Sequence, residues 1–210
     1  MTCIEIFTII KDAAVTGAAI TGAFVAVKGL GTWRRQLKGS SEYELSRRIL
    51  VTLFKYRDAI NGVRHPAMWG FETPAPPEDE ARSMSYEQIR FYGISRAYQV
   101  RWDKVKCERT TLYADLLEAE AIWGEDLNSL FKVVFDLQHE LFNKIHHHLE
   151  LINPDVHELS KEAIRKVDAK GRDIMYDLLG EVPDEFKTDV IDAIKKIESY
   201  LKPKLNHEKV

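Results

Sequence analysis

Apolar residues follow two different patterns along the chain, and both patterns predict helix. Residues 13–27 form a run without a charged side chain, whereas from residue 41 onward apolar residues recur at steps of three and four. Such steps match the period of an amphipathic α-helix, and no stretch alternates apolar and polar residues between turn signals as a strand would. The sequence therefore predicts an all-α protein with an apolar N-terminal helix and an elongated antiparallel bundle of amphipathic helices.

The first helix of the body is expected over residues 41–63. Ser41 and Glu44 have the spacing of a capping box, and a His-Pro pair follows the end of the pattern. The apolar face of this helix comprises Leu45, Ile49, Leu53, Tyr56, Ile60 and Val63.

Residues 64–82 are expected to form an irregular loop, because their prolines exclude a continuous helix. Met68, Trp69 and Phe71 are bulky apolar residues within this loop. We expect Trp69 and Phe71 to hold the loop on the bundle, and the three residues together are a candidate interaction loop.

Two long apolar stripes on either side of Gly124 predict an antiparallel, coiled-coil-like helical hairpin over residues 83–123 and 125–152. The first stripe contains Phe91, Tyr98, Trp102, Val105, Leu112, Leu116, Ala119 and Trp123, and Ser83 or Ser85 can cap its helix. The second contains Leu127, Leu130, Val134, Leu137, Leu141, Ile145, Leu149 and Ile152. Arg109 lies on the first stripe, where an isolated buried charge is costly, so we expect it to pair with a carboxylate and fix register, or to mark a site.

Two shorter helices are expected to close the chain. One begins at residue 155 or 160 and runs to 179, with Ile164, Val167, Ile174 and Leu178 facing inward. The other begins at residue 183 and is stopped by Pro203. Its apolar face comprises Phe186, Val190, Ile194, Ile197 and Leu201.

The N-terminal run has the length and the flanks of a single membrane span. A bilayer core needs about 20 predominantly apolar residues in a helix, and residues 13–32 supply them if Lys28 extends toward the headgroups. The basic excess after the span places the C-terminal body in the cytoplasm, with the span in the inner (cytoplasmic) membrane. A buried core helix and a helix lying in the membrane interface are the alternatives. The interface anchors are Trp33, Arg34, Arg35 and Lys38.

Small residues recur within this span, which includes Ala13, Gly17, Ala18, Gly22 and Val27. Ala14, Ala18 and Gly22 repeat every four residues, a spacing that lets two helix backbones approach closely in lipid. Self-association of the anchor is one hypothesis, and the general abundance of alanine and glycine in membrane spans is the other explanation.

The charge balance divides the chain into unlike parts. The 210 residues carry 30 basic and 33 acidic side chains, a net charge of −3. Residues 1–39 carry +3 and residues 40–210 carry −6, so a membrane anchor with a basic juxtamembrane segment precedes an acidic helical body. The acidic body disfavours general binding of nucleic acid, and two cysteines exclude a disulfide-rich scaffold.

The strongest cluster of candidate metal ligands lies in the second hairpin helix, where His139 and the run His146–His148 are near several carboxylates. Di-iron bundles need two Glu-x-x-His motifs facing inward, whereas this chain has one Asp-x-x-His and its histidines miss the apolar stripe. We therefore expect solvent-exposed histidines, no metal and no cofactor. Cys107 is expected to be a buried or idle thiol, and no phosphate-binding loop or serine elbow occurs.

Three segments carry a resemblance to other proteins: Gly-Leu-Gly-Thr-Trp-Arg-Arg-Gln-Leu-Lys-Gly at residues 29–39, residues 42–48, and the ending at 197–203. They resemble a group of uncharacterised bacterial proteins that have one N-terminal membrane span and a helical cytoplasmic body. The resemblance covers a small part of the chain. It implies no activity and assigns no catalytic residue.

The patterns together favour a membrane-tethered helical scaffold or interaction module without enzymatic activity, which binds itself or another protein. An oligomerising membrane effector that perturbs the bilayer is the alternative, and it requires several copies because one span makes no pore. A metal-dependent helical-bundle enzyme is the third and least favoured interpretation, because the ligand set is incomplete.

Overall fold

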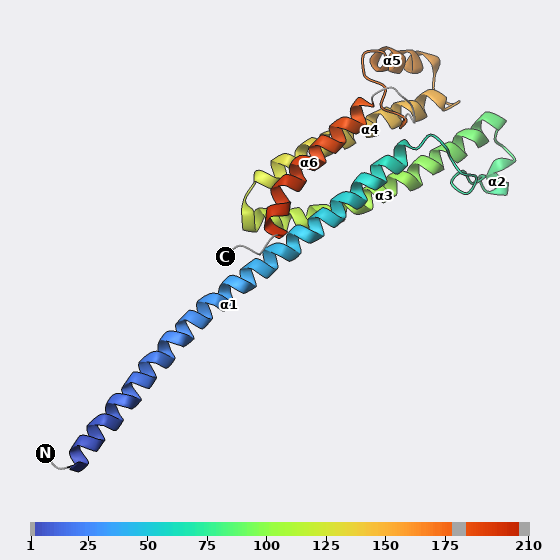
Figure 1. Ribbon diagram of the computed structural model, residues 1–210. Coiled ribbons are helices and arrows are strands. Elements are labelled where there is room, and N and C mark those ends of the chain that lie inside the picture. Colours follow the sequence, from blue (N-terminus) through green and yellow to red (C-terminus); the bar gives the residue numbers. More distant parts are fainter. Residues whose placement is uncertain (1–2, 178–183, 206–210) are drawn as a thin grey trace. The chain divides into compact units, whose positions relative to one another are not determined.

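The structure is a computed structural model that describes residues 3–177 and 184–205, with side chains described from residue 15 onward. In these ranges the chain forms helices and no strand, which confirms the predicted all-α class (Figure 1). The helices are α1 (Cys3–Arg64), α2 (Glu78–Ala81), α3 (Tyr86–Trp123), α4 (Asp126–Ile152), α5 (Glu158–Asp168) and α6 (Glu185–Leu205). The chain divides into two compact units after Glu44, so we describe the N-terminal part of α1 and the bundle of residues 45–205 separately.

α1 continues through the position at which the sequence predicts a helix start. Residues 39–41 are helical, so the capping box expected at Ser41 and Glu44 is wrong. No proline occurs between residues 3 and 64, and a glycine inside a helix costs only about 1 kcal/mol, which its helix-forming neighbours offset. Lys38 and Glu42 form an i,i+4 ion pair of 3.8 Å across the expected break.

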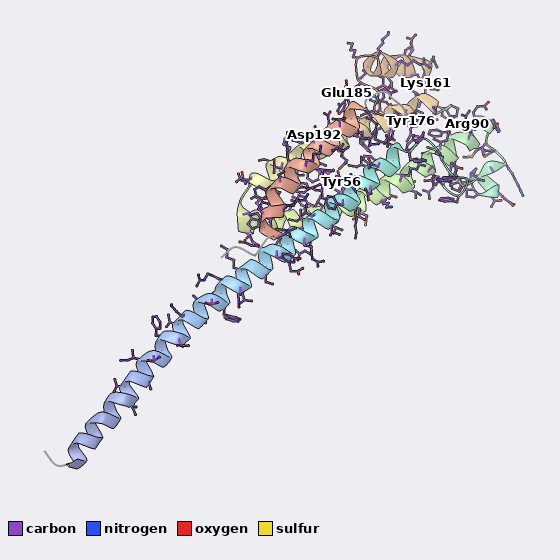
Figure 2. All side chains as sticks on the ribbon, viewed as in Figure 1. Tyr56, Arg90, Lys161, Tyr176, Glu185 and Asp192 are labelled. Atoms are coloured by element: carbon purple, nitrogen blue, oxygen red, sulfur yellow. The ribbon has the colours of Figure 1, made fainter. Side chains whose placement is uncertain are left out.

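The C-terminal part of α1 presents its predicted apolar face to the bundle core. Each predicted position has at most 2% of its surface exposed: Leu45, Ile49, Leu53, Tyr56, Ile60 and Val63. Tyr56 lies inside the bundle (Figure 2), where its hydroxyl donates to Gln138 Oε1 of α4 at 2.5 Å. Burial raises the pKa of Tyr56, so the phenol stays neutral and the hydrogen bond ties α1 to α4.

α3 and α4 form the predicted antiparallel hairpin. Ser85 begins α3 with a capping box, because its hydroxyl accepts from the Gln88 amide while the Gln88 side chain accepts from the Ser85 amide. Gly124 joins the helices with a φ of 79°, a conformation that suits glycine. Most of the two predicted stripes is buried, and the buried members are Tyr98, Trp102, Val105, Leu112, Leu116, Ala119, Leu127, Val134, Leu137, Leu141 and Ile145.

Arg109 is exposed, so the expectation of a buried charge that fixes the register of the hairpin is wrong. Its guanidinium lies over the Phe135 ring, 4.9 Å from the ring centre, so the long side chain contacts an aromatic face while the residue stays exposed to water. The buried arginines in the described part of the chain are Arg64 and Arg101, which the sequence did not single out.

α5 and α6 complete the bundle, with α6 beside α4 (Figure 1). α5 ends at Asp168, eleven residues earlier than the apolar pattern suggests, and Val167 is 59% exposed rather than inward. Ile174 is buried but lies in the irregular segment after α5, and Leu178 lies outside the described residues. The predicted face of α6 is confirmed, since Phe186, Val190, Ile194, Ile197 and Leu201 are all buried.

Pro203 lies inside the last turn of α6 and does not stop it, contrary to expectation. A proline so close to the helix end removes a single backbone hydrogen bond, and burial of Leu201 on the preceding turn offsets that loss. The helix therefore continues to Leu205.

Arg64 joins the end of α1 to the segment that precedes α6. It is only 1% exposed, and its guanidinium donates to the carbonyl oxygens of Ile174 at 2.8 Å and Tyr176 at 2.9 Å. It also pairs with Asp184 Oδ2 at 2.8 Å and lies over the Phe186 ring (Tyr176 is labelled in Figure 2). Partial burial raises the pKa of Asp184, but the Lys187 amide and Arg64 outweigh burial and hold this pKa below its ordinary value.

A candidate membrane helix and a candidate interaction loop

The N-terminal part of α1 exposes its apolar side chains. Every described side chain from residue 15 to residue 30 is exposed, including Phe24 at 61% and Val27 at 72%. An 18-residue window within the helix has a mean hydropathy of 1.3 and no buried residue. Among the described residues, one helix is long enough and apolar enough to cross a membrane, and it is α1. By length and composition it suits a membrane anchor or a signal sequence.

Polar groups within the apolar run bond to their own helix. The Thr21 hydroxyl donates to the Gly17 carbonyl at 2.8 Å, and the Thr32 hydroxyl donates to the Lys28 carbonyl at 3.1 Å. The Lys28 ammonium lies over the Phe24 ring at 5.3 Å from its centre. Hydroxyls that are satisfied within the helix need no water, which is what a helix in a lipid environment requires.

The small residues of the run leave open space beside the helix. A methyl group added at Gly17 or Gly22 would meet nothing within 4 Å, and Ala18 is exposed. The side chain of Ala13 lies outside the described ones. Trp33, Arg34, Arg35 and Lys38 are likewise exposed, so no described residue covers either the run or the basic residues that follow it.

Arg101 of α3 organises the loop between α1 and α3. This side chain is only 8% exposed, and its guanidinium donates to both carboxylate oxygens of Glu72 at 2.8 Å. It also donates to the carbonyl oxygens of His65 at 2.8 Å and Ala67 at 2.7 Å. Glu72 in turn accepts from the Trp69 amide at 3.0 Å. A bidentate pair with further backbone acceptors fixes the loop in one conformation.

We call these contacts of Arg101 with Glu72 and with the His65 and Ala67 carbonyl oxygens the Arg101 clamp. The clamp changes the pKa of Glu72. The hydrogen bonds from Arg101 lower the pKa of Glu72 from 4.5 to about 2, although burial alone would raise it. The carboxylate therefore stays charged at any physiological pH.

Loss of this charge should weaken the fold at low pH. Because the folded pKa lies below the unfolded one, the pair contributes its full stability above about pH 4.5 and loses it as the pH falls toward 2. We expect wild type to exceed Glu72→Gln by about 2 kcal/mol in free energy of unfolding at pH 7. Urea titrations of both proteins should show this difference shrinking below pH 4.5 and vanishing near pH 2. A difference that is independent of pH would contradict the role of the Glu72 charge.

The aromatic residues of the loop point away from the core. Trp69 is 59% exposed and Phe71 is 84% exposed, so the expectation that they hold the loop on the bundle is wrong. Met68 packs against the core and Pro76 is buried, and together with the Arg101 clamp they attach the loop. The exposed rings are thus displayed on a loop that other residues hold in place.

A cavity of about 370 Å³ lies beside these rings, between the end of α1, the loop and α3. Its lining includes the apolar residues Trp69, Phe71 and Val100 and the charged residues Asp58 and Lys104. We call these five residues the loop surface. Val100 is 56% exposed, which adds a third apolar side chain to the two aromatic ones. The lining thus combines exposed apolar and charged side chains, and protein-binding surfaces contain both kinds.

The histidines of α4 do not form a metal-binding group with other described residues. No three or more histidine, cysteine, aspartate or glutamate side chains in the described part of the chain are placed to hold a metal ion. His139 and His146 are exposed as expected, but His147 is half-buried and bonds to Asp168 of α5 at 2.8 Å. His148 is also half-buried, and burial, followed by Lys144, lowers its pKa. His147 therefore helps to attach α5. Cys107 is exposed, which excludes the first of the two alternatives expected for it, a buried thiol.

Comparison of the chain with protein-family models, with curated proteins and with solved structures finds no match. The fold and the site described above are therefore the basis for a functional conclusion. They show an all-helical protein with one long apolar N-terminal helix.

Proposed function

We propose that the chain is a membrane-tethered interaction module without enzymatic activity. In this proposal α1 crosses the inner membrane once, the helical bundle lies in the cytoplasm, and the loop surface binds protein.

One observation carries the proposal: the apolar run of α1 is exposed along its whole described length, from Val15 to Leu30. A helix of this composition in water would leave an apolar surface far larger than the patches that soluble monomers expose. A bilayer covers such a surface, and the internally bonded Thr21 and Thr32 hydroxyls fit that environment.

The residues that follow the run support the orientation. Trp33 comes at the end of the run and suits headgroup depth, and Arg34, Arg35 and Lys38 are exposed immediately beyond it. Because short segments rich in arginine and lysine stay on the cytoplasmic side, the bundle is expected on that side. The same cations can contact anionic headgroups, each contributing about 1 kcal/mol near the surface.

Charges placed in the run should release the protein from the membrane. Each acidic side chain near the middle of a span costs about 2.5–3.5 kcal/mol, so the double variant Ile20→Glu/Phe24→Glu should move from the membrane to the soluble fraction after alkaline extraction. The matched control is Tyr113→Glu/Leu117→Glu, which places the same charges at exposed apolar positions of α3. We expect the control to stay in the membrane fraction. Equal distribution of the two variants would contradict the anchor.

A further inference from the structure

The loop surface carries an exposed aromatic ring, a cavity and side chains of both charges. We propose that it binds the loop surface of a second copy of this chain across a two-fold axis. Phe71 of each copy enters the cavity beside Val100 of the other copy, and Lys104 of each copy pairs with Asp58 of the other. This proposal deepens the proposed function, because it names the partner of the interaction loop.

Phe71 provides an exposed apolar side chain for this contact. Phe71 is the most exposed of the described large apolar side chains at 84%, and it lies beside a cavity of about 370 Å³ that its own chain leaves open. A projecting ring, and a cavity whose lining includes apolar residues, lie on the same surface and can therefore contact each other between two copies. Each copy then buries its Phe71 ring in the cavity of the other copy. Because both surfaces are used up, the assembly stops at two chains.

Asp58 and Lys104 are both exposed beside this cavity. Lys104 is exposed, and no ion pair joins it to another described residue. Asp58 is 65% exposed and accepts from Arg57 through Oδ1, so its second oxygen can accept from a further donor. A two-fold interface requires each charge to have its opposite on the same surface, and this pair satisfies that requirement.

The clamp around Arg101 reduces the cost of association. Because Arg101 and Glu72 already fix the loop that carries Phe71, docking orders few further backbone dihedrals. The patch is nevertheless small compared with the area of about 1,200 Å² that stable complexes in solution bury. Confinement of both copies to one membrane supplies the missing affinity by raising their effective concentration. We therefore expect the interface to form in the membrane-bound protein.

Disulfide cross-linking of the full chain in native membranes tests the proposal. Two differently tagged copies, both carrying Cys3→Ser and Cys107→Ser, are produced together, one with Phe71→Cys and the other with Val100→Cys. After mild oxidation we expect the tagged heterodimer to form in about tenfold higher yield than with the control pair Phe71→Cys and Ser160→Cys. Ser160 is exposed on α5, so it controls for random collision. Equal yields from the two pairs would overturn the two-fold interface.

Charge reversal provides a second test, in which recovery by the combined variant separates lost charge pairing from misfolding. On the cross-linking background, Lys104→Glu or Asp58→Lys in both copies should each lower the yield about fivefold by placing like charges together, and the two changes combined in both copies should restore it. Failure of the combined variant to recover would contradict the pairing. A chain that stays in the membrane fraction but gives no specific cross-link retains its anchor and loses only the second copy as partner, so the two proposals fail separately.

Discussion

Replacing Arg64 with alanine should lower the free energy of unfolding of the bundle by about 4 kcal/mol. The variant leaves Asp184 as a partly buried carboxylate without its arginine partner and removes the donors to the Ile174 and Tyr176 carbonyl oxygens. It also leaves a cavity above the Phe186 ring. Urea unfolding of the full chain in detergent micelles, followed by tryptophan fluorescence, measures the change.

The variant Arg64→Lys separates charge from geometry. Lysine keeps the positive charge near Asp184, but it lacks the planar fork that reaches two carbonyl oxygens and a carboxylate together. We expect it to recover less than half of the loss. A destabilisation below about 1 kcal/mol for Arg64→Ala would show that the segment before α6 does not depend on this side chain.

Replacing Arg101 with alanine should cost about 3 kcal/mol and open the loop between α1 and α3. The change removes four hydrogen bonds that connect α3 to Glu72 and to the His65 and Ala67 carbonyl oxygens. We expect limited proteolysis to cut the loop near Trp69 in the variant and to spare it in wild type, because an unclamped loop samples extended conformations.

Arg96→Ala is the matched control for Arg101→Ala. Arg96 lies on the same helix, five residues before Arg101, and is exposed. Its side chain donates a hydrogen bond to Gln99 Oε1. We expect a change within about 0.5 kcal/mol and no new cleavage. If both variants expose the loop equally, the clamp is not what holds it.

The apolar stripes could be predicted because burial imposes a period. The stripe of α1 from Leu45 to Val63 and the predicted face of α6 are buried at every position named from the sequence. Helix ends were predicted less well, because Ser41 has the spacing of a cap without being one and Pro203 lies too near an end to break its helix. The bounds of α5 failed for a related reason. Ile174 is apolar and buried but belongs to an irregular segment.

The polar contacts that hold the irregular segments could not be predicted, because their partners are distant in sequence. Arg64 meets acceptors 110 to 120 residues away, and Arg101 meets Glu72, which lies 29 residues away. Sequence favours Arg109 as the buried charge because it lies on an apolar stripe, yet its long side chain reaches solvent. One signal was available for Arg101, which immediately precedes the buried Trp102.

The depth of α1 in a bilayer tests the central claim most directly. Single cysteines at Ala18, Phe24, Leu30 and Leu37, on the Cys3→Ser/Cys107→Ser background, can carry nitroxide labels in the full chain reconstituted into vesicles. For a helix that spans a core about 30 Å thick, collision with oxygen should be greatest and collision with a water-soluble nickel chelate least at Phe24, with the reverse at Leu37. Equal access of the nickel chelate to all four positions would contradict a membrane anchor.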